Sequence, residues 1–179
     1  MVVVLLLVAA CARNDATPAA LPEPADADAD VYAVVLRRYL THGNENSFPD
    51  KAFAEVYVLD RADPRAADPM RQVDEPASAQ RIPDARQSAI SAALADLTKI
   101  RFVASRDEVV VDKEGCAQVR DGGILITLAP PVGGDDEVRV GINGFVACLG
   151  ATWLTYVVKR SGDGGGWTVT GTTGEMAVS

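Results

Sequence analysis

The chain has 179 residues, of which 48% are hydrophobic, 23% charged and 6% aromatic, and its formal net charge is -8. This length suits one domain with a hydrophobic core, and the composition excludes a chain that is disordered throughout. The acidic balance argues against DNA or RNA as a partner, because nucleic-acid binding draws most of its affinity from Lys and Arg that neutralise phosphates.

The chain opens with an unbroken apolar run, residues 2–10 (VVVLLLVAA), that ends directly at Cys11. A transmembrane helix takes about 20 apolar residues, so this run is too short to cross a bilayer. Its length matches the hydrophobic region of a secretory signal, which ends in small residues at the cleavage point. We therefore predict a signal peptide over residues 1–10.

The stretch Val8-Ala9-Ala10-Cys11 resembles the lipobox of bacterial lipoproteins, in which an aliphatic residue and two small residues precede the cysteine. The resemblance implies cleavage before Cys11, a diacylglyceryl thioether on its sulfur, fatty acyl groups such as palmitate, and anchoring on the extracytoplasmic side of the cell membrane. A signal peptide normally has a basic start, whereas no Lys or Arg precedes Arg13. The alternative interpretation makes residues 2–8 a buried strand and Cys11 an ordinary core thiol.

Residues 12–30 consist almost entirely of Ala, Pro and Asp. Such a segment cannot bury enough apolar surface to offset the entropy lost on ordering it. The alternating Asp residues at its end lack the turn-forming Gly and the bidentate acid of a calcium loop, which favours a solvated spacer. We predict a lipid-anchored disordered tether over residues 11–30 and a single folded domain over residues 31–179.

Two amphipathic helices are predicted within this domain. The first follows Asp30, an N-cap residue type, and ends near Gly43. The second begins at Pro83 as its first helical residue and carries an apolar stripe at helical spacing. Residues 61–82, which hold three prolines and no regular period, are predicted to form a long loop, and loops of this length often serve as lids or binding segments.

The rest of the domain alternates with the period of β-strands, between turns rich in Gly and Asp. We predict an α+β fold with two helices packed on one face of a curved, mostly antiparallel sheet. The order of elements is similar to that of cone-shaped folds of the NTF2-like and cystatin-like kind. The predicted strands cover residues 55–60, 100–104, 109–111, 124–128, 138–142, 153–160 and 167–170.

Two cysteines remain once Cys11 is assigned to a lipid, and an even pair in an oxidising compartment suggests a possible disulfide between Cys116 and Cys148. In the chain-entropy model, a bond closing a loop of about 30 residues stabilises the fold by roughly 3 kcal/mol. The alternative is two separate thiols.

His42 is the only histidine, and it lies where the first helix is predicted to end, a position that suits interaction with the helix dipole. One histidine excludes a zinc site built from several imidazoles, and it lacks ligand spacing to Cys116 or Cys148. The glycine-rich residues 162–166 lack the Lys-Ser/Thr of a phosphate-binding loop, which favours a hairpin turn. We therefore predict no metal, no cofactor and no catalytic residue.

The leading functional interpretation is a membrane-tethered, non-enzymatic domain that contacts an envelope protein or a small ligand. The first alternative is a binding module with a cone-shaped pocket for a small hydrophobic ligand. The second is a pocket enzyme that uses a single carboxylate. The candidate carboxylates are Asp60, Asp107, Glu108 and Asp112, and the aromatic residues that would either pack the sheet or face a ligand are Phe145, Trp153, Tyr156 and Trp167.

Overall fold

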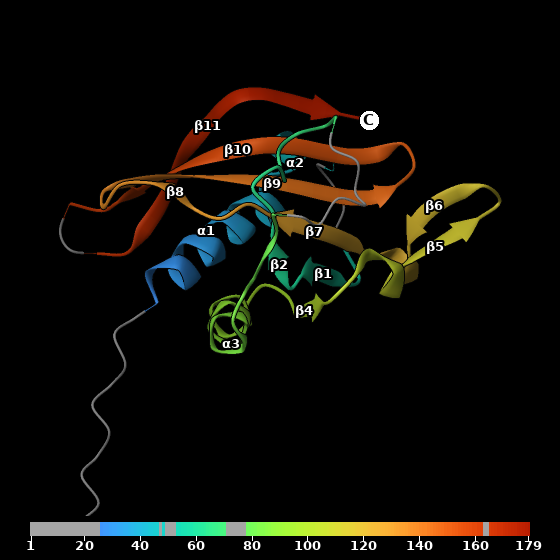
Figure 1. The fold of residues 1–179 in the computed structure, drawn as a ribbon, viewed down its shortest axis with the longest axis horizontal. Helices are drawn as coiled ribbons and strands as arrows, with labels where there is room; N and C mark the ends of the chain where they lie inside the picture. The colour runs from blue at the N-terminus through green and yellow to red at the C-terminus, as the bar shows by residue number, and fades with distance from the viewer. Residues whose placement is uncertain (1–25, 47, 49–52, 71–77, 163–164) are drawn as a thin grey trace, which may run out of the picture.

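The computed structural model describes residues 26–46, 48, 53–70, 78–162 and 165–179 (Figure 1). They form a mixed α+β fold in which a strongly curled sheet dominates, so the predicted fold class is confirmed. Within these residues, no helix is long and apolar enough to cross a membrane. The predicted signal peptide, Cys11 and the tether up to residue 25 lie outside the described residues.

The main sheet has the strand order β11-β10-β9-β7-β1-β4; β8 pairs with the start of β9, β6 pairs with its end, and β5 pairs with β6. Its pairs are antiparallel except that β1 runs parallel to both β4 and β7. A separate pair joins β2 (Arg61–Ala62) to β3 (Gln80–Arg81). The main-sheet strands are β1 Val56–Leu59, β4 Ile100–Val103, β5 Val110–Lys113, β6 Cys116–Val119, β7 Ile124–Leu128, β8 Val132–Gly133, β9 Glu137–Ala147, β10 Gly150–Arg160 and β11 Trp167–Val178.

Each predicted strand appears in the sheet, but the last three are longer than predicted. β9 and β10 each have 11 residues and β11 has 12. These three strands contain glycine and polar residues that hide the alternation, and their pairing with one another supplies the hydrogen bonds that extend them. The predicted long loop also contains structure, because β2 and β3 lie within it.

Three α-helices occur among the described residues: α1 (Ala27–Thr41), the four-residue α2 (Gly43–Asn46) and α3 (Asp84–Ala93), together with the 3₁₀ turns η1 (Arg106–Glu108) and η2 (Arg120–Gly122). The expected number of two is therefore not confirmed. Pro83 occupies the N-cap of α3 rather than its first helical position.

The start of α1 corrects the predicted boundary between tether and domain. The N-cap is Asp26 and not Asp30, and its carboxylate accepts hydrogen bonds from the backbone N–H groups of Asp28 and Ala29 at 3.1 and 3.2 Å. The guanidinium of Arg86 in α3 also contacts Asp26 at 2.8 Å and Asp28 at 2.9 Å. The acids that suggested a solvated spacer therefore form the capped first turn of a helix.

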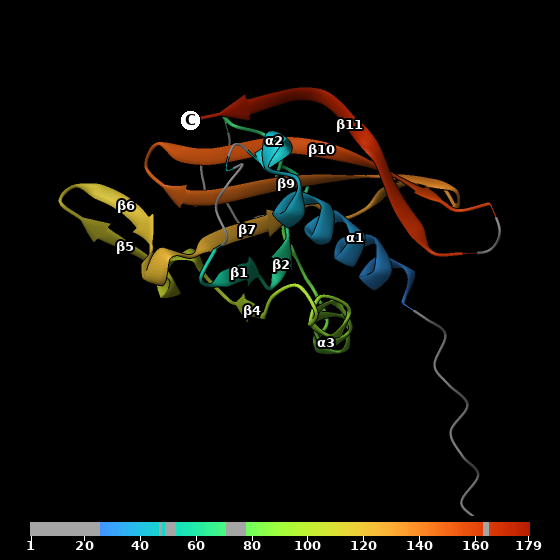
Figure 2. The ribbon, with the colours of Figure 1, turned by 180° about the vertical axis from the view of Figure 1, so that it is seen from behind.

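Helix α1 packs into the concave face of the curled sheet, in front of β9 and β10 when the molecule is seen from behind (Figure 2). Its buried side chains meet the inward-facing residues of β1, β7, β9 and β10 in one large core. α3 adds Ile90 and Leu94 to this core. The largest side chains that α1 contributes are Tyr32, Leu36 and Tyr39.

Tyr39 marks the closest approach of α1 to the sheet. A Cβ atom added at Gly144 of β9 would overlap the Tyr39 hydroxyl and ring. The Tyr39 hydroxyl also hydrogen-bonds the Thr152 hydroxyl of β10 at 2.5 Å, and Asn46 Nδ2 donates to the Tyr39 carbonyl at 2.6 Å. Glycine at position 144 therefore lets the end of α1 touch the sheet.

A second, smaller core lies on the other face of the sheet, because alternate side chains of a strand point to opposite sides. Val109, which follows η1, and Val119, at the base of the β5–β6 hairpin, pack into it. Its buried members are Tyr57, Val103, Val109, Val119 and Leu125.

We predict that Gly144→Ala lowers the free energy of unfolding of the full chain by about 2 kcal/mol, because the added methyl group forces Tyr39 out of its place. Urea unfolding measures the change. Gly171→Ala in β11 is the control, since its Cβ would meet nothing within 4 Å. Adding Tyr39→Leu to Gly144→Ala should recover part of the loss. Equal stability of the two alanine variants would contradict this packing.

Candidate functional site

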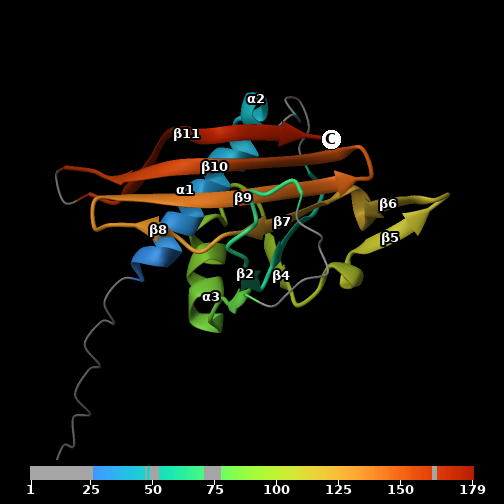
Figure 3. The ribbon, with the colours of Figure 1, turned by 45° about the horizontal axis from the view of Figure 1, so that its top comes forward.

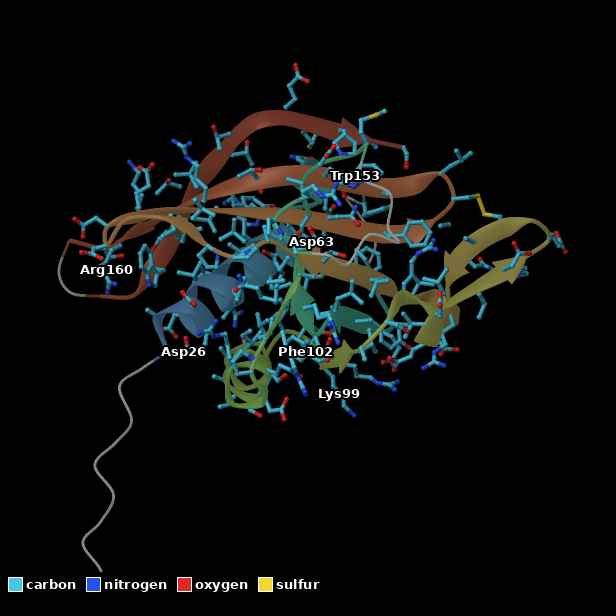
Figure 4. The ribbon with its side chains drawn as sticks, viewed as in Figure 1. Asp26, Asp63, Lys99, Phe102, Trp153 and Arg160 are labelled. Carbon is cyan, nitrogen blue, oxygen red and sulfur yellow. A yellow bond between two sulfur atoms is a disulfide. The ribbon has the colours of Figure 1, made fainter. Side chains whose placement is uncertain are left out.

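A cavity of about 190 Å³ lies on the sheet face opposite α1. Its floor consists of two rows of side chains that cross neighbouring strands. One row runs from Thr127 in β7 through Asn143 in β9 to Trp153 in β10, and the other from Leu125 through Phe145 to Ala151. Figure 4 labels Trp153 on its strand. The strand register thus brings together residues that lie far apart in the sequence.

The walls of the cavity come from four further residues. Leu59 ends β1, Arg106 begins η1, Cys148 lies in the turn between β9 and β10, and Ser179 follows β11. Cys148 forms a disulfide with Cys116 of β6, with a Cα–Cα distance of 5.5 Å. The predicted pair is thus joined in the structure, and the bond ties the β5–β6 hairpin to the β9–β10 turn beside the cavity.

The polar groups at the cavity are few, and their surroundings differ. The Arg106 guanidinium stacks over the Phe145 ring, with Cζ 4.8 Å from the ring centroid. Asn143 Nδ2 donates to the Thr152 carbonyl at 3.0 Å, which fixes the orientation of its amide. Thr127 is only 5% exposed, and its hydroxyl makes no hydrogen bond within the described part of the chain. The arrangement is an apolar floor with a cation at its edge and an unused hydroxyl inside.

None of the predicted carboxylates lines this cavity. Asp60 lies at 3.6 and 4.0 Å from the guanidinium groups of Arg61 and Arg81. Glu108 accepts backbone hydrogen bonds at the start of η1, and Asp112 accepts one from Gly115 N in the β5–β6 turn. Asp107, next to Glu108, is exposed. The structure therefore does not bring any of the four to a shared site.

The predicted aromatic residues divide between the two faces of the sheet. Phe145 and Trp153 line the cavity, whereas Tyr156 and Trp167 belong to the main core beneath α1. The periodicity of β9 and β10 could separate Phe145 and Trp153 from Tyr156, since the first two have odd numbers in strands whose even positions face α1.

His42 is the C-cap residue of α1, as its position in the sequence indicated. Its backbone N–H donates to the Arg38 carbonyl at 3.0 Å, and its Nδ1 lies 3.0 Å from the Thr41 hydroxyl. Among the residues that the structure describes, no group of three or more His, Cys, Asp or Glu could hold a metal ion.

A half-buried polar network at the same end of α1 is a second candidate site. Arg38 forms a bidentate ion pair with Glu45, and the Tyr156 hydroxyl donates to Glu45 at 2.9 Å. The Arg38 guanidinium lowers the pKa of Glu45, while burial raises the pKa of Tyr156. Glu45 therefore stays ionised and Tyr156 stays protonated at neutral pH. Because both oxygens of Glu45 are already occupied, this network holds α1, α2 and β10 together and offers no open position to a substrate.

The glycine-rich segment predicted as a hairpin turn does connect β10 to β11, and Ser161 N donates to the Gly166 carbonyl at 3.0 Å across it. Residues 163–164 within it lie outside the described residues.

Comparison with known proteins identifies no relative. No protein-family model, no curated protein and no solved structure matches this chain.

Proposed function

We propose that this protein is a non-enzymatic envelope lipoprotein, anchored through lipid on Cys11, whose folded domain binds a small apolar ligand. The observation that supports binding is the cavity above the two cross-strand rows. Its apolar surface consists of Leu125, Phe145, Ala151 and Trp153. Ligand sites are typically concave and mostly apolar, with a few polar groups that orient the ligand.

The proposed ligand site does not lie inside the cone of the sheet. The concave interior is filled by α1 and the main core, so the proposed binding site uses the opposite face. Binding is favoured over catalysis because a general acid or base must reach its substrate, and the candidate carboxylates lie away from the cavity lining.

The direction of the tether suits this function. Residue 26, where the described chain begins, lies at one end of the sheet, and the β9–β10 turn and the β5–β6 hairpin lie at the other (Figure 3). Helix α1 has 15 residues and so covers about 22 Å of this length. Residues 12–25 span at most about 50 Å when fully extended. The attachment point and the cavity are therefore at opposite ends of the domain.

A second candidate function is contact with another envelope protein. Three apolar side chains near the cavity end of the sheet are exposed, namely Leu149, Met176 and Val178 at 85%, 50% and 53%. Exposed apolar side chains that gather at one end of a domain favour an interaction surface.

The lipid anchor predicts that radiolabelled palmitate enters the full chain in a bacterium that processes lipoproteins, and that Cys11→Ala abolishes the label. The thiol of Cys11 would be the acceptor of the diacylglyceryl group, so its removal should abolish the label while the rest of the lipobox is unchanged. Ala9→Ser is the control, because it keeps a small residue before the cysteine. Label that survives in Cys11→Ala would refute the lipid claim.

The binding site predicts that a neutral aromatic probe, benzamide, shifts the indole N–H resonance of Trp153 and leaves that of Trp167 unchanged. The chain has only these two tryptophans, and Trp167 lies in the main core under Arg160. We expect a dissociation constant of about 1 mM for so small a probe. The full chain should carry Cys11→Ser, so that it carries no lipid and can be titrated without a membrane or detergent.

Two variants sharpen this titration. Ala151→Leu fills the cavity from its floor and should abolish the shift of Trp153, while the Trp167 resonance reports that the main core is intact. Val132→Leu adds a methylene at a position that is 68% exposed and outside this cavity, and should leave binding unchanged. Absence of any Trp153 shift in the parent chain would contradict the proposed function.

A further inference from the structure

We infer that the ligand of this cavity is a small carboxylate with a ring-sized apolar body, whose carboxylate pairs with Arg106. The inference rests on the proposed function and deepens it by naming the chemical class of the ligand. Two observations support it: the unpaired charge of Arg106 and the hydroxyl of Thr127, both in the cavity lining.

Arg106 differs from most arginines in the described residues. Seven others have a carboxylate oxygen within 4.0 Å, namely Arg37, Arg38, Arg61, Arg81, Arg86, Arg101 and Arg120. Within the described part of the chain, the guanidinium of Arg106 has neither a carboxylate partner nor a hydrogen bond, and its contact is the face of Phe145. A guanidinium presents donors in a planar fork that matches a carboxylate.

The two acids nearest to Arg106 in the sequence do not neutralise it. Asp107 is exposed and has no ion pair among the described residues. Glu108 accepts hydrogen bonds from the backbone N–H groups of Ala104 and Ser105, which points its carboxylate back along the chain. The positive charge of Arg106 therefore remains available at the edge of the cavity.

Thr127 gives a second and independent indication. Its side chain is 95% buried, it lines the cavity, and its hydroxyl has no partner within the described residues. This hydroxyl is not among the fully enclosed polar atoms that lack a partner, so it borders the open space of the cavity and can hydrogen-bond a ligand there. Thr127 and Phe145 belong to neighbouring rows of the floor, about 7 Å apart along a strand. A ligand that reaches both has about the length of a substituted ring.

The volume of the cavity also fits a ligand of this size. An apolar cavity of about 150 Å³ can hold benzene. The observed volume of about 190 Å³ therefore admits a six-membered ring with one carboxylate. Leu125 and Ala151 form the floor under such a ring. Arg106 lies above the Phe145 ring at the edge of the cavity.

Three probes separate charge from apolar body in the full chain carrying Cys11→Ser. Benzoate has both features, benzamide has the ring without the charge, and acetate has the charge without the ring. Following the Trp153 indole resonance, we expect benzoate to bind about tenfold more tightly than benzamide, because hydrogen bonds to charged groups are the stronger ones. Acetate should bind more weakly than either, and added salt should weaken the binding of benzoate but not that of benzamide.

Arg106→Met should reduce the affinity for benzoate about tenfold, to the level of benzamide, and leave benzamide binding unchanged. Methionine keeps an apolar stem over Phe145, and the Trp167 resonance reports an intact core. Arg101→Met is the matched control, since Arg101 also stacks over an aromatic ring, that of Tyr57 at 5.3 Å, and lies outside the cavity lining.

The outcomes distinguish this inference from the proposed function. Equal binding of benzoate and benzamide, or equal loss of benzoate in the Arg106 and Arg101 variants, would overturn the inference while leaving a cavity that binds apolar ligands. Binding of acetate as tight as that of benzoate would mean that the cavity recognises a bare anion and would overturn the stated ligand class. No shift of Trp153 with any probe would reject the proposed function itself.

Discussion

The packing of α1 into the curl of the sheet determines where this domain can bind anything. Tyr39 at the end of the helix touches the backbone at Gly144 and hydrogen-bonds Thr152, so helix and sheet meet without a gap. The concave side is consequently a closed core of large side chains. Space for a ligand is found instead on the other face, where the covering elements are short and irregular.

That second face is organised by strand register and by one covalent bond. Three strands place Thr127, Asn143 and Trp153 in one row, and the next row gives an apolar floor. The disulfide holds the β5–β6 hairpin to the β9–β10 turn beside these rows. The bond helps to hold this hairpin in place beside the cavity, because an isolated two-stranded hairpin is only marginally stable. Disulfides persist in oxidising compartments, which is consistent with the envelope location proposed above.

Local sequence patterns predicted the fold class and the strand β7 at its observed bounds, since an apolar run between turns is a local signal. They failed at α1, whose first turn depends on Arg86, sixty residues away from Asp26. They also failed at the cavity. Phe145 and Trp153 were candidates to face a ligand, but Arg106 and Thr127 carry no motif, and only the pairing of distant strands shows that they share a site. The resemblance to cone-shaped folds remains a prediction.

The central claim is that the open space of this domain lies on the face away from α1. Xenon is the most direct probe, because it enters apolar cavities without needing a specific ligand. In crystals of the chain pressurised with xenon, the account predicts an atom beside Leu125 and Ala151, between β7 and β10. Xenon bound between α1 and the sheet, with none at that position, would contradict it.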